Sequence, residues 1–503
     1  MSDPIENLRR QAKRLRKSWE NSDPEAIARL EAVLSPAKRE NPQHAEFLHV
    51  IARERNFTSW PALKAAAETE GLDRAEKQQR LKIALFHGQN HVVRALLDQT
   101  PDLARGILGL EIALYDLPTV EAAIANDPAC ATRKLGPRTP ILHLCFSRYI
   151  HIAPEKKRDM LRIAELLVAN GADVNDGFEQ EPGSGYLLPA LYGALGHANN
   201  LALAEWLLDH GASPNDEESL YHSTELGHHD GLRLLLKHGA ATKGTNALIR
   251  MLDFDDLEGA RILLEHGADP NEVAHEHSSG EPIPIIPSLH QAARRGRDGR
   301  FADLLLDFGA DATVEWQAYT PWAVARIYGN AAFADALTAR GYESDLSAED
   351  QVLADCAALV KTGERVEFSS LPKESRLLLT RIASMPGRVD HAKALIAAGF
   401  DPDYPDEMGL PPLHLAGWAG RSDMLRYLLT LGPDLSHKNG YGGNALETVV
   451  HGSENAPRDA ETDHAECIRL LIGAGAQPTP LLIENAGDPE ISELLRQLAS
   501  ETA

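Results

Sequence analysis

The chain has 503 residues, and its 50 Lys and Arg against 74 Asp and Glu give a formal net charge of −24. Because phosphate contacts require a basic surface, this charge argues against binding to nucleic acid or to an anionic membrane. Hydrophobic residues make up 43% and charged residues 25% of the chain, proportions that are typical of folded proteins. Aromatic residues account for only 6%, which predicts a core of Ala and Leu.

The four cysteines show no metal-binding or redox spacing; they are Cys130, Cys145, Cys356 and Cys467. We therefore expect reduced, mostly buried thiols in a cytoplasmic protein. The first twenty residues are charged and lack the apolar run of a secretory signal. No stretch approaches the roughly 18 apolar residues of a membrane span, so we expect no membrane association.

Residues 1–72 are predicted to form a separate group of helices. The segments 8–34 and 44–68 have helical patterning, with Ser22 or Asp23 as a cap and a break at Asn56 and Phe57. We expect this group to cover the apolar face that the first unit of a stacked array would otherwise expose.

Two weakly patterned helix pairs follow, at 81–103 and 110–130, in the region 73–134. They have the rhythm of the later units but end in Thr-Pro or Asp-Pro. We interpret them as degenerate repeats.

From residue 135 onward, one pattern recurs along the chain. An apolar helix ends in Leu-Leu and runs into a glycine, as in LLVANGADVN at 166–175 and LLEHGADPN at 263–271. The glycine marks the end of a helix, where the backbone adopts a positive φ that costs Gly little. The successive glycines define a unit of about 33 residues, with insertions; they are Gly171, Gly211, Gly239, Gly267, Gly309, Gly341, Gly399, Gly432 and Gly475.

A second signal stands upstream of many of these helices. It is clearest in PPLHLAGWAGR at 411–421 and occurs also in TPWAVARIYGN at 320–330. Thr-Pro begins a short helix, with Thr as the cap and Pro in the first turn.

Together the two signals resemble the ankyrin repeat, in which a short inner helix is followed by an outer helix and a hairpin finger. The resemblance implies an all-α ankyrin-repeat solenoid of helix-turn-helix units with short β-hairpin fingers and an N-terminal helical cap. The resemblance is strong over about 135–345 and 390–480. The group of helices at 1–72 resembles the helical segment that precedes the ankyrin array in some bacterial proteins. The predicted organisation is a cap at 1–72, degenerate repeats at 73–134, repeats at 135–345, a degenerate repeat at 346–390, and repeats with a C-terminal capping helix at 391–503.

The insertions in this pattern fall at the edges of the array. Two lie in finger loops, at 176–188 and 272–288, and two separate the helices of one unit, at 147–159 and 452–463. A solenoid tolerates such insertions. They are either neutral or, in the case of the two long fingers, the rims of a pocket. The apolar run IPIIP at 283–287 is expected to fold back onto the array.

Common catalytic strings are absent: the sequence has no Walker loop, no G-x-S-x-G and no H-E-x-x-H. We therefore assign no catalytic residue, no cofactor and no metal. Most histidines have structural positions by the resemblance, among them His210, His238, His266, His290 and His414. His275 and His277 could chelate a metal, but two ligands on one loop make a weak site.

The stretch ESLYHSTELGHH at 218–229 departs from the repeat consensus. Tyr221 stands where the family has its structural His, and Ser223 and Thr224 replace packing alanines. By alignment, His222 faces the concave groove, as do His143 and Arg250 in other units. This region is either a local hydrogen-bonding network or a ligand pocket.

In the pocket hypothesis, the binding residues are His143, Tyr221, His222, Glu225 and Arg250, with Gly193 leaving a hollow between them. His143 and His222 are two units, or about 16–20 Å, apart, which is too far for one metal ion. Arg and His would favour a small anionic ligand or an acidic side chain.

Two functions remain open from the sequence. The first is an interaction scaffold that binds a protein partner through its groove and fingers, as the resemblance implies. The alternative is a small-molecule-binding protein or an enzyme with a polar pocket around Tyr221–Glu225. The fold cannot decide between them.

Overall fold

The computed structural model describes residues 4–40, 42–179, 183–273, 286–361, 363–456 and 458–502. Over these ranges the chain is mostly helical, as predicted, and its only sheet pairs two three-residue strands. The described residues up to 241 form one compact unit, and those from 242 onward form a second. This division falls inside the region 135–345 that the sequence presents as one run of repeats.

The first unit begins with five helices, of which the first, second, fourth and fifth have a common core. Asp23 caps the second helix by accepting a hydrogen bond from the Glu25 amide, and Ser59 caps the fifth. Phe47 and Ile51 are fully buried in this core. The helices are α1 (Pro4–Glu20), α2 (Pro24–Glu31), α3 (Pro36–Glu40), α4 (His44–Glu54) and α5 (Trp60–Thr69). Helix α5 packs against the first repeat, as expected for a cap.

Five repeats complete the first unit, each with an inner and an outer helix. Short 3₁₀ segments accompany two of them, and a strand pair precedes the fourth. The elements are α6 (Arg74–His87), α7 (Asn90–Gln99), α8 (Leu108–Ala113), α9 (Leu117–Asn126), η1 (Pro128–Ala131), α10 (Pro140–Cys145), η2 (Tyr149–His151), η3 (Pro154–Lys156), α11 (Lys157–Ala169), β1 (Gly177–Glu179), β2 (Leu187–Pro189), α12 (Ala190–Tyr192), the π-helical η4 (Gly193–His197), α13 (Leu201–Asp209), α14 (Ser219–Ser223) and α15 (Asp230–Lys237).

The second unit continues the same alternation. Its elements are α16 (Ala247–Asp253), α17 (Leu257–Glu265), α18 (Ser288–Arg294), α19 (Gly299–Asp307), α20 (Pro321–Ile327), α21 (Ala331–Ala339), α22 (Ala348–Ala357), η5 (Phe368–Ser370), α23 (Lys373–Arg376), α24 (Leu378–Ile382), α25 (Val389–Ala397), α26 (Pro412–Trp418), α27 (Ser422–Leu429), α28 (Ala445–Asn455), α29 (His464–Gly473), α30 (Pro480–Asn485) and α31 (Pro489–Thr502). In the region 346–390, α22 is followed by short helices instead of a second long one.

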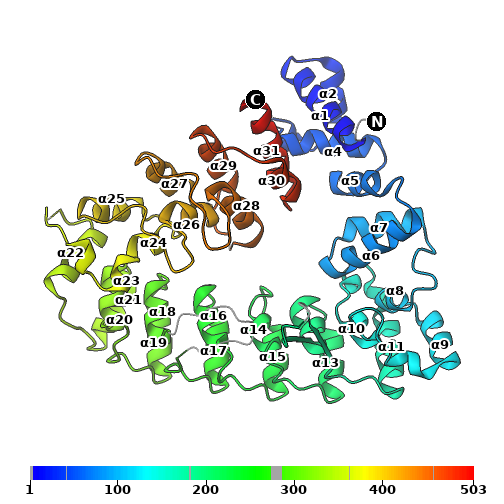
Figure 1. The fold of residues 1–503 in the computed structure, drawn as a ribbon, viewed down its shortest axis with the longest axis horizontal. Coiled ribbons are helices and arrows are strands. Elements are labelled where there is room, and N and C mark those ends of the chain that lie inside the picture. Colours follow the sequence, from blue (N-terminus) through cyan, green and yellow to red (C-terminus); the bar gives the residue numbers. More distant parts are fainter. Residues whose placement is uncertain are drawn as a thin grey trace. The chain divides into compact units, whose positions relative to one another are not determined.

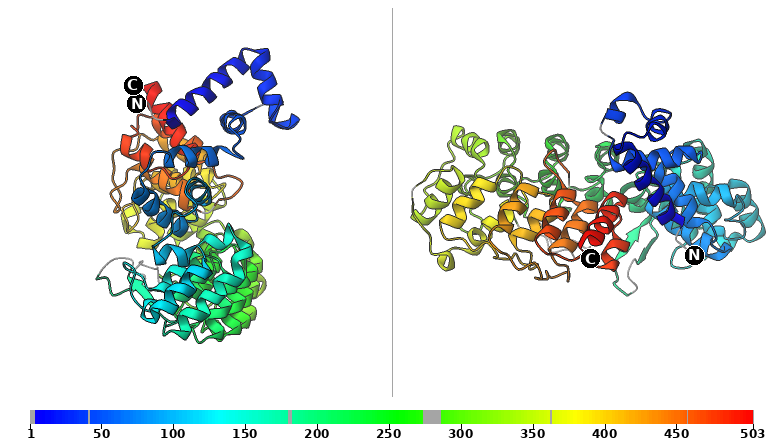
Figure 2. Two further views of the ribbon diagram at one scale, coloured as in Figure 1. Left: turned by 90° about the vertical axis from the view of Figure 1, so that its right-hand side faces the viewer. Right: turned by 90° about the horizontal axis from the view of Figure 1, so that it is seen from above.

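Within each unit, inner helices pack on inner helices and outer helices on outer helices. In the second unit α18 packs on α20 and α26 on α28, while α19 packs on α21 and α27 on α29. Figure 1 shows these stacked pairs, and Figure 2 shows them from two further directions. Each repeat therefore buries its apolar face against its neighbours.

The recurring glycines end the outer helices in the predicted way. Gly171, Gly211, Gly239, Gly267 and Gly309 have φ between 86° and 95°. In each case the amide of the following Ala donates to a Leu carbonyl five residues back, for instance Ala212 to Leu207 over 2.9 Å. This bond satisfies a carbonyl that the helix end leaves without a partner.

Asparagine side chains connect successive repeats after these turns. The Asn175 amide donates to the Gly211 carbonyl over 3.2 Å and accepts from the Ser213 amide over 2.8 Å. Asn271 makes the corresponding pair of bonds to Gly309 and Asp311 in the second unit. Each Asn thereby fixes the register of one repeat on the next.

Only one described finger is a regular hairpin. Strands β1 and β2 pair antiparallel, with Phe178 opposite Leu188, inside the predicted finger 176–188. Elsewhere in the described ranges the fingers contain single bridges, Leu135 to Arg138 and Trp316 to Tyr319. In the other long finger, residues 274–285 lie outside the described chain, and Ile286 at its end is fully buried.

Candidate functional site

Helix α14 begins at an unusual turn. The Asp216 carboxylate accepts hydrogen bonds from the Ser219 amide and hydroxyl, over 2.7 and 2.6 Å, and from the Glu218 amide. Glu217 has a φ of 68°, in the left-handed region that non-glycine residues rarely adopt. This turn leaves Glu218 only 1% exposed, although Glu is seldom buried without a partner.

His222 lies between two carboxylates. Its Nε2 is 3.0 Å from Oε2 of Glu218, and its Nδ1 is 3.0 Å from Oε2 of Glu225. One ring nitrogen of a neutral imidazole carries no proton, so both contacts are hydrogen bonds only when His222 is protonated. The geometry therefore corresponds to an imidazolium held by two carboxylates.

The environment of His222 has opposing effects on its pKa. Burial disfavours the charged form, but the hydrogen bonds and charges of Glu218 and Glu225 outweigh it and raise the pKa of His222 to about 9. Burial also raises the pKa of Asp216, with a further contribution from the charge of Glu218. The cluster keeps a net negative charge even with His222 protonated.

Two tyrosine rings lie against the His222 imidazole. The Tyr192 ring centroid lies 4.8 Å from that of His222, and the Tyr221 ring meets it edge-on at 5.1 Å. A Cβ on Gly196 would lie 2.9 Å from Cβ of His222, so this glycine permits the close approach of α14 to η4. The imidazolium is thus enclosed on the side of the preceding repeat.

Tyr186, from the hairpin finger, approaches the same carboxylate. Burial, and then the nearby Glu218, raise the pKa of the Tyr186 phenol. A side-chain hydrogen bond to Glu218 contributes to this rise, so the phenol and the buried carboxylate pair with each other. The finger is thereby connected to the first turn of α14.

A cavity of about 550 Å³ lies between the finger and the turn before α14. Tyr186, Leu187, Asp216 and Glu217 contribute to its wall. Leu187 is 53% exposed on the finger. The lining offers carboxylates and apolar surface, and a positively charged group would be attracted to it.

The hydroxyls that replace packing alanines are satisfied locally. Ser223 donates to the Leu220 carbonyl over 2.7 Å, and Thr224 donates to that of Tyr221 over 2.6 Å. These two bonds agree with the interpretation of this stretch as a local network.

The structure brings Tyr221, His222 and Glu225 together and places His143 elsewhere. The His143 ring lines a different cavity, where its Nε2–H donates to the Leu135 carbonyl over 3.0 Å. Burial lowers the pKa of His143. The predicted hollow at Gly193 is wrong, because a Cβ there would lie 2.5 Å from the Phe146 ring, which fills the space.

Arg250 belongs to the second unit. Its guanidinium carbon lies 4.7 Å from the centroid of the Phe254 ring, at the C-terminal end of its own helix α16. The grouping of Arg250 with His222 remains a prediction.

The consensus histidines have structural roles, as the resemblance implies. His290 Nε2–H donates to the Tyr319 carbonyl of the next repeat over 2.9 Å, and burial lowers its pKa to about 4. His210 and His266 contact carbonyls one turn back in their own helices. His275 and His277 lie outside the described residues.

Sequence reasoning missed the residues that complete the cluster. Glu218 was detectable, since a carboxylate four residues before His222 lies on the same helix face. Tyr186 and Tyr192 gave no signal, because they are about 30 positions away along the chain and the fold alone places them near His222.

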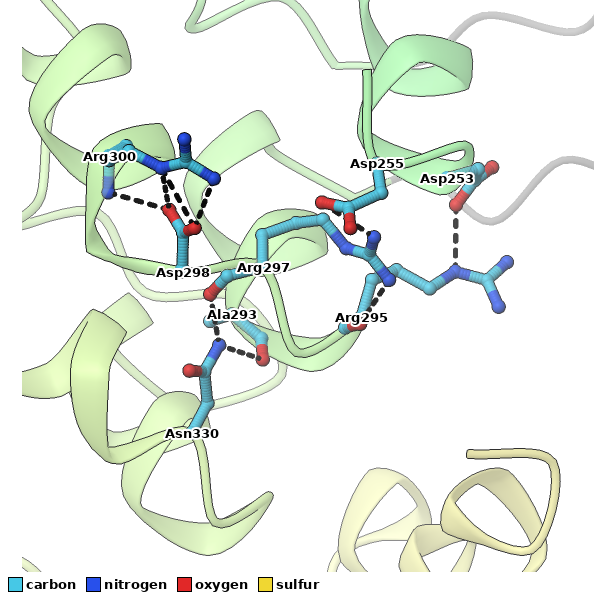
Figure 3. A network of polar contacts seen from close by, with 8 residues as sticks. All are labelled: Asp253, Asp255, Ala293, Arg295, Arg297, Asp298, Arg300 and Asn330. Carbon is cyan, nitrogen blue, oxygen red and sulfur yellow. Dashed lines mark hydrogen bonds and ion pairs between the residues drawn. The ribbon is translucent and has the colours of Figure 1, made fainter. Parts of the chain in front are cut away.

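A second polar network lies in the second unit, around the turn after α18 (Figure 3). Arg295 pairs with Asp253 at 2.7 Å and Arg297 with Asp255 at 2.9 Å. The buried Asn330 side chain donates to the carbonyls of Ala293 and Arg297. These contacts connect neighbouring repeats and leave the charges paired, so the network is structural.

Two further observations concern binding in general. Across the described ranges, no three His, Cys, Asp or Glu side chains gather in a way that could hold a metal ion. Over the same residues, none of the helices is both long and apolar enough to cross a membrane.

Comparisons with known proteins agree with this architecture. Family models described as "Ankyrin repeats" match residues 190–274 (three copies) and 381–429 (many copies); the first match spans the boundary between the two units, and the second lies in the second unit. No curated protein was found to match the chain.

Solved structures include two similar domains. The human ASB11 ankyrin repeat domain is 19% identical, with 50% of this chain and 96% of that one covered and a TM-score of 0.24. An ankyrin repeat domain from Acinetobacter baumannii AYE is 24% identical, with coverages of 39% and 99% and a TM-score of 0.31. The family matches and the repeated helix pairs show that the chain contains ankyrin repeats.

Proposed function

We propose that the chain binds a protein partner through the α14 surface, defined as Tyr186, Asp216, Glu217, His222 and Glu225. Ankyrin repeats are generally protein-interaction modules, and binding of this kind needs no chemistry of its own. We also propose a cytoplasmic location, which the four buried free cysteines support.

One observation carries the proposal. The cavity between the hairpin finger and the turn before α14 has the carboxylates of Asp216 and Glu217 in its wall, beside the half-exposed Leu187, and no Lys or Arg among its described lining residues. A cationic side chain with an apolar stem fits this combination of charge and apolar surface.

The charge of the surface favours a basic partner group over an anion. Two carboxylates, Glu218 and Glu225, pair with the single imidazolium of His222, and two more, Asp216 and Glu217, precede Glu218 in the chain. A Lys or Arg side chain that enters the 550 Å³ cavity would meet Asp216, Glu217 and the apolar Leu187. We therefore propose a Lys- or Arg-containing segment as the ligand, in place of the anionic group that sequence analysis favours.

Peptide selection on the immobilised full chain tests this proposal. A random peptide display library should yield segments enriched in Lys or Arg, and their affinity should fall by about tenfold or more in Asp216→Asn/Glu217→Gln. Glu121→Gln, an exposed carboxylate on α9, is the matched control and should bind like wild type. Selected peptides without basic residues, or equal binding by both variants, would refute the assignment.

A further inference from the structure

A second cavity of about 820 Å³ lies in the first unit, between α6, α8, α10 and the turn that precedes α10. Most of its wall is apolar, including Ile83, Phe86, Leu108 and Phe146. Its volume is in the range of sites that enclose small organic molecules, about 300–1,000 Å³. None of this wall overlaps the α14 surface.

The charged groups of this wall are all basic. Lys82, Arg133 and Arg138 contribute to it, and no Asp or Glu is among its lining residues, every one of which the structure describes. Arg133 is paired with the exposed Asp127 at 2.8 Å. Lys82 and Arg138 form no ion pair with any described residue. A basic cavity is unexpected in a chain with a net charge of −24.

Arg138 is held by aromatic rings instead of by a carboxylate. Its guanidinium carbon lies 4.2, 4.4 and 5.1 Å from the ring centroids of Phe178, Phe86 and Phe146. Burial alone lowers the pKa of the guanidinium, to about 10. Since its Nε has no hydrogen-bond partner among the described residues, the cation keeps capacity for an anion.

His143 fixes the turn that carries Arg138. Its bond to the Leu135 carbonyl anchors a turn in which Leu135 and Arg138 form a bridge. A Cβ on Gly109 would lie 3.1 Å from the His143 ring, so the absence of a side chain at this position leaves room for the ring beside α8. The position of Arg138 is therefore set before any ligand arrives, which lowers the cost of binding.

We propose that this cavity binds a small organic anion, a molecule with an apolar body and one carboxylate or phosphate group. The apolar body would lie against Ile83 and Leu108, and the anionic group would meet Arg138 and Lys82. This site is separate from the proposed protein-binding surface, and either assignment can fail without the other.

Calorimetric titration of the full chain tests the proposal with named probes. We expect naphthalene-1-acetate, octanoate or phenyl phosphate to bind. The neutral naphthalene-1-acetamide and the cationic octylammonium should bind at least about tenfold more weakly, because they lack the charge that Arg138 would pair with. Inorganic phosphate alone should bind weakly, since it has no apolar body.

Two substitutions locate the binding. Ile83 is 38% exposed, so Ile83→Glu places a carboxylate at the cavity wall with little effect on the core, and it should weaken anion binding by about tenfold or more. Ile27→Glu, at a residue 36% exposed on α2, is the matched control. Arg138→Met should abolish binding, and Lys157→Gln, an exposed lysine on α11, should not alter it.

Several results would overturn the proposal. Equal binding of naphthalene-1-acetate and its amide would mean an apolar cavity without anion recognition. If none of the three anionic probes binds to a chain with wild-type helicity, the cavity is not a site for small organic anions. Binding of hexaglutamate with no binding of the small anions would assign the cavity to an acidic protein segment. If Arg138→Met does not fold, the titration of Ile83→Glu tests the proposal alone, and unchanged anion binding by that variant would overturn it.

Discussion

Nε2 of His222 lies 3.0 Å from Oε2 of Glu218, a carboxylate whose side chain is only 1% exposed. A buried carboxylate is costly unless it is paired, and removing its partner leaves an uncompensated charge. The protonation of His222 is therefore coupled to the folding of the first unit.

This coupling predicts a pH-dependent stability. The folded pKa of His222, about 9, exceeds its unfolded value near 6.5, so its contribution is fully present below pH 6.5 and is lost as the pH rises through 9. We expect His222→Gln to lower the free energy of unfolding of the first unit by up to about 3 kcal/mol at pH 6 and by little above pH 9. Denaturant melts of both proteins at several pH values measure this difference. A constant difference from pH 6 to 10 would contradict the coupling.

The two carboxylates should contribute unequally to the pKa of His222. Glu218→Gln removes the buried partner, whereas Glu225 is 31% exposed and more strongly screened by water. We expect the pKa of His222 to fall further in Glu218→Gln than in Glu225→Gln. An NMR titration of the imidazole protons measures both changes, and equal shifts would indicate that burial does not distinguish them.

Gly193 is a position where a methyl group should not be tolerated. A Cβ would lie 2.5 Å from the Phe146 ring, which is 2% exposed and packed between Phe86 and Phe178. We expect Gly193→Ala to destabilise the first unit by about 1–3 kcal/mol. Gly473→Ala is the control, since no atom lies within 4 Å of the added Cβ, and thermal melts compare the two. A stable Gly193→Ala would mean that the ring moves freely.

The network in Figure 3 contains two kinds of contact that should contribute unequally to the free energy of unfolding. Asn330→Ala removes the buried amide that donates to the carbonyls of Ala293 and Arg297 and also the helix cap at Phe333, which should cost about 1–3 kcal/mol. Asp255→Ala breaks an ion pair whose carboxylate is 65% exposed, so we expect a change below about 1 kcal/mol. Urea denaturation of the two variants gives the comparison, and equal losses would contradict it.

The chain should unfold in more than one step. Repeat arrays are stabilised by contacts between neighbours, and the structure divides into two compact units. We expect His222→Gln to change only the transition of the first unit and Asn330→Ala only that of the second. Calorimetry with equal calorimetric and van't Hoff enthalpies and a single peak would contradict this expectation.

Local patterns predicted much of this fold. The glycine after Leu-Leu marked each outer-helix end, because a positive φ and the bond from the next amide involve only neighbouring residues. The spacing of Glu218, His222 and Glu225 could likewise be read from one helix face. The division into two compact units could not be predicted, since it depends on contacts between repeats.

The sequence by itself determined the repeat, the glycine that ends each outer helix and the structural histidines, because each depends on short-range geometry that the residue types impose. The tertiary structure alone decided that Tyr192 lies against the His222 ring and Tyr186 near Glu218, that Phe146 fills the space at Gly193, and that three phenylalanines surround Arg138. Burial and cation–π contacts depend on which distant segments pack together, and local sequence patterns do not predict those contacts.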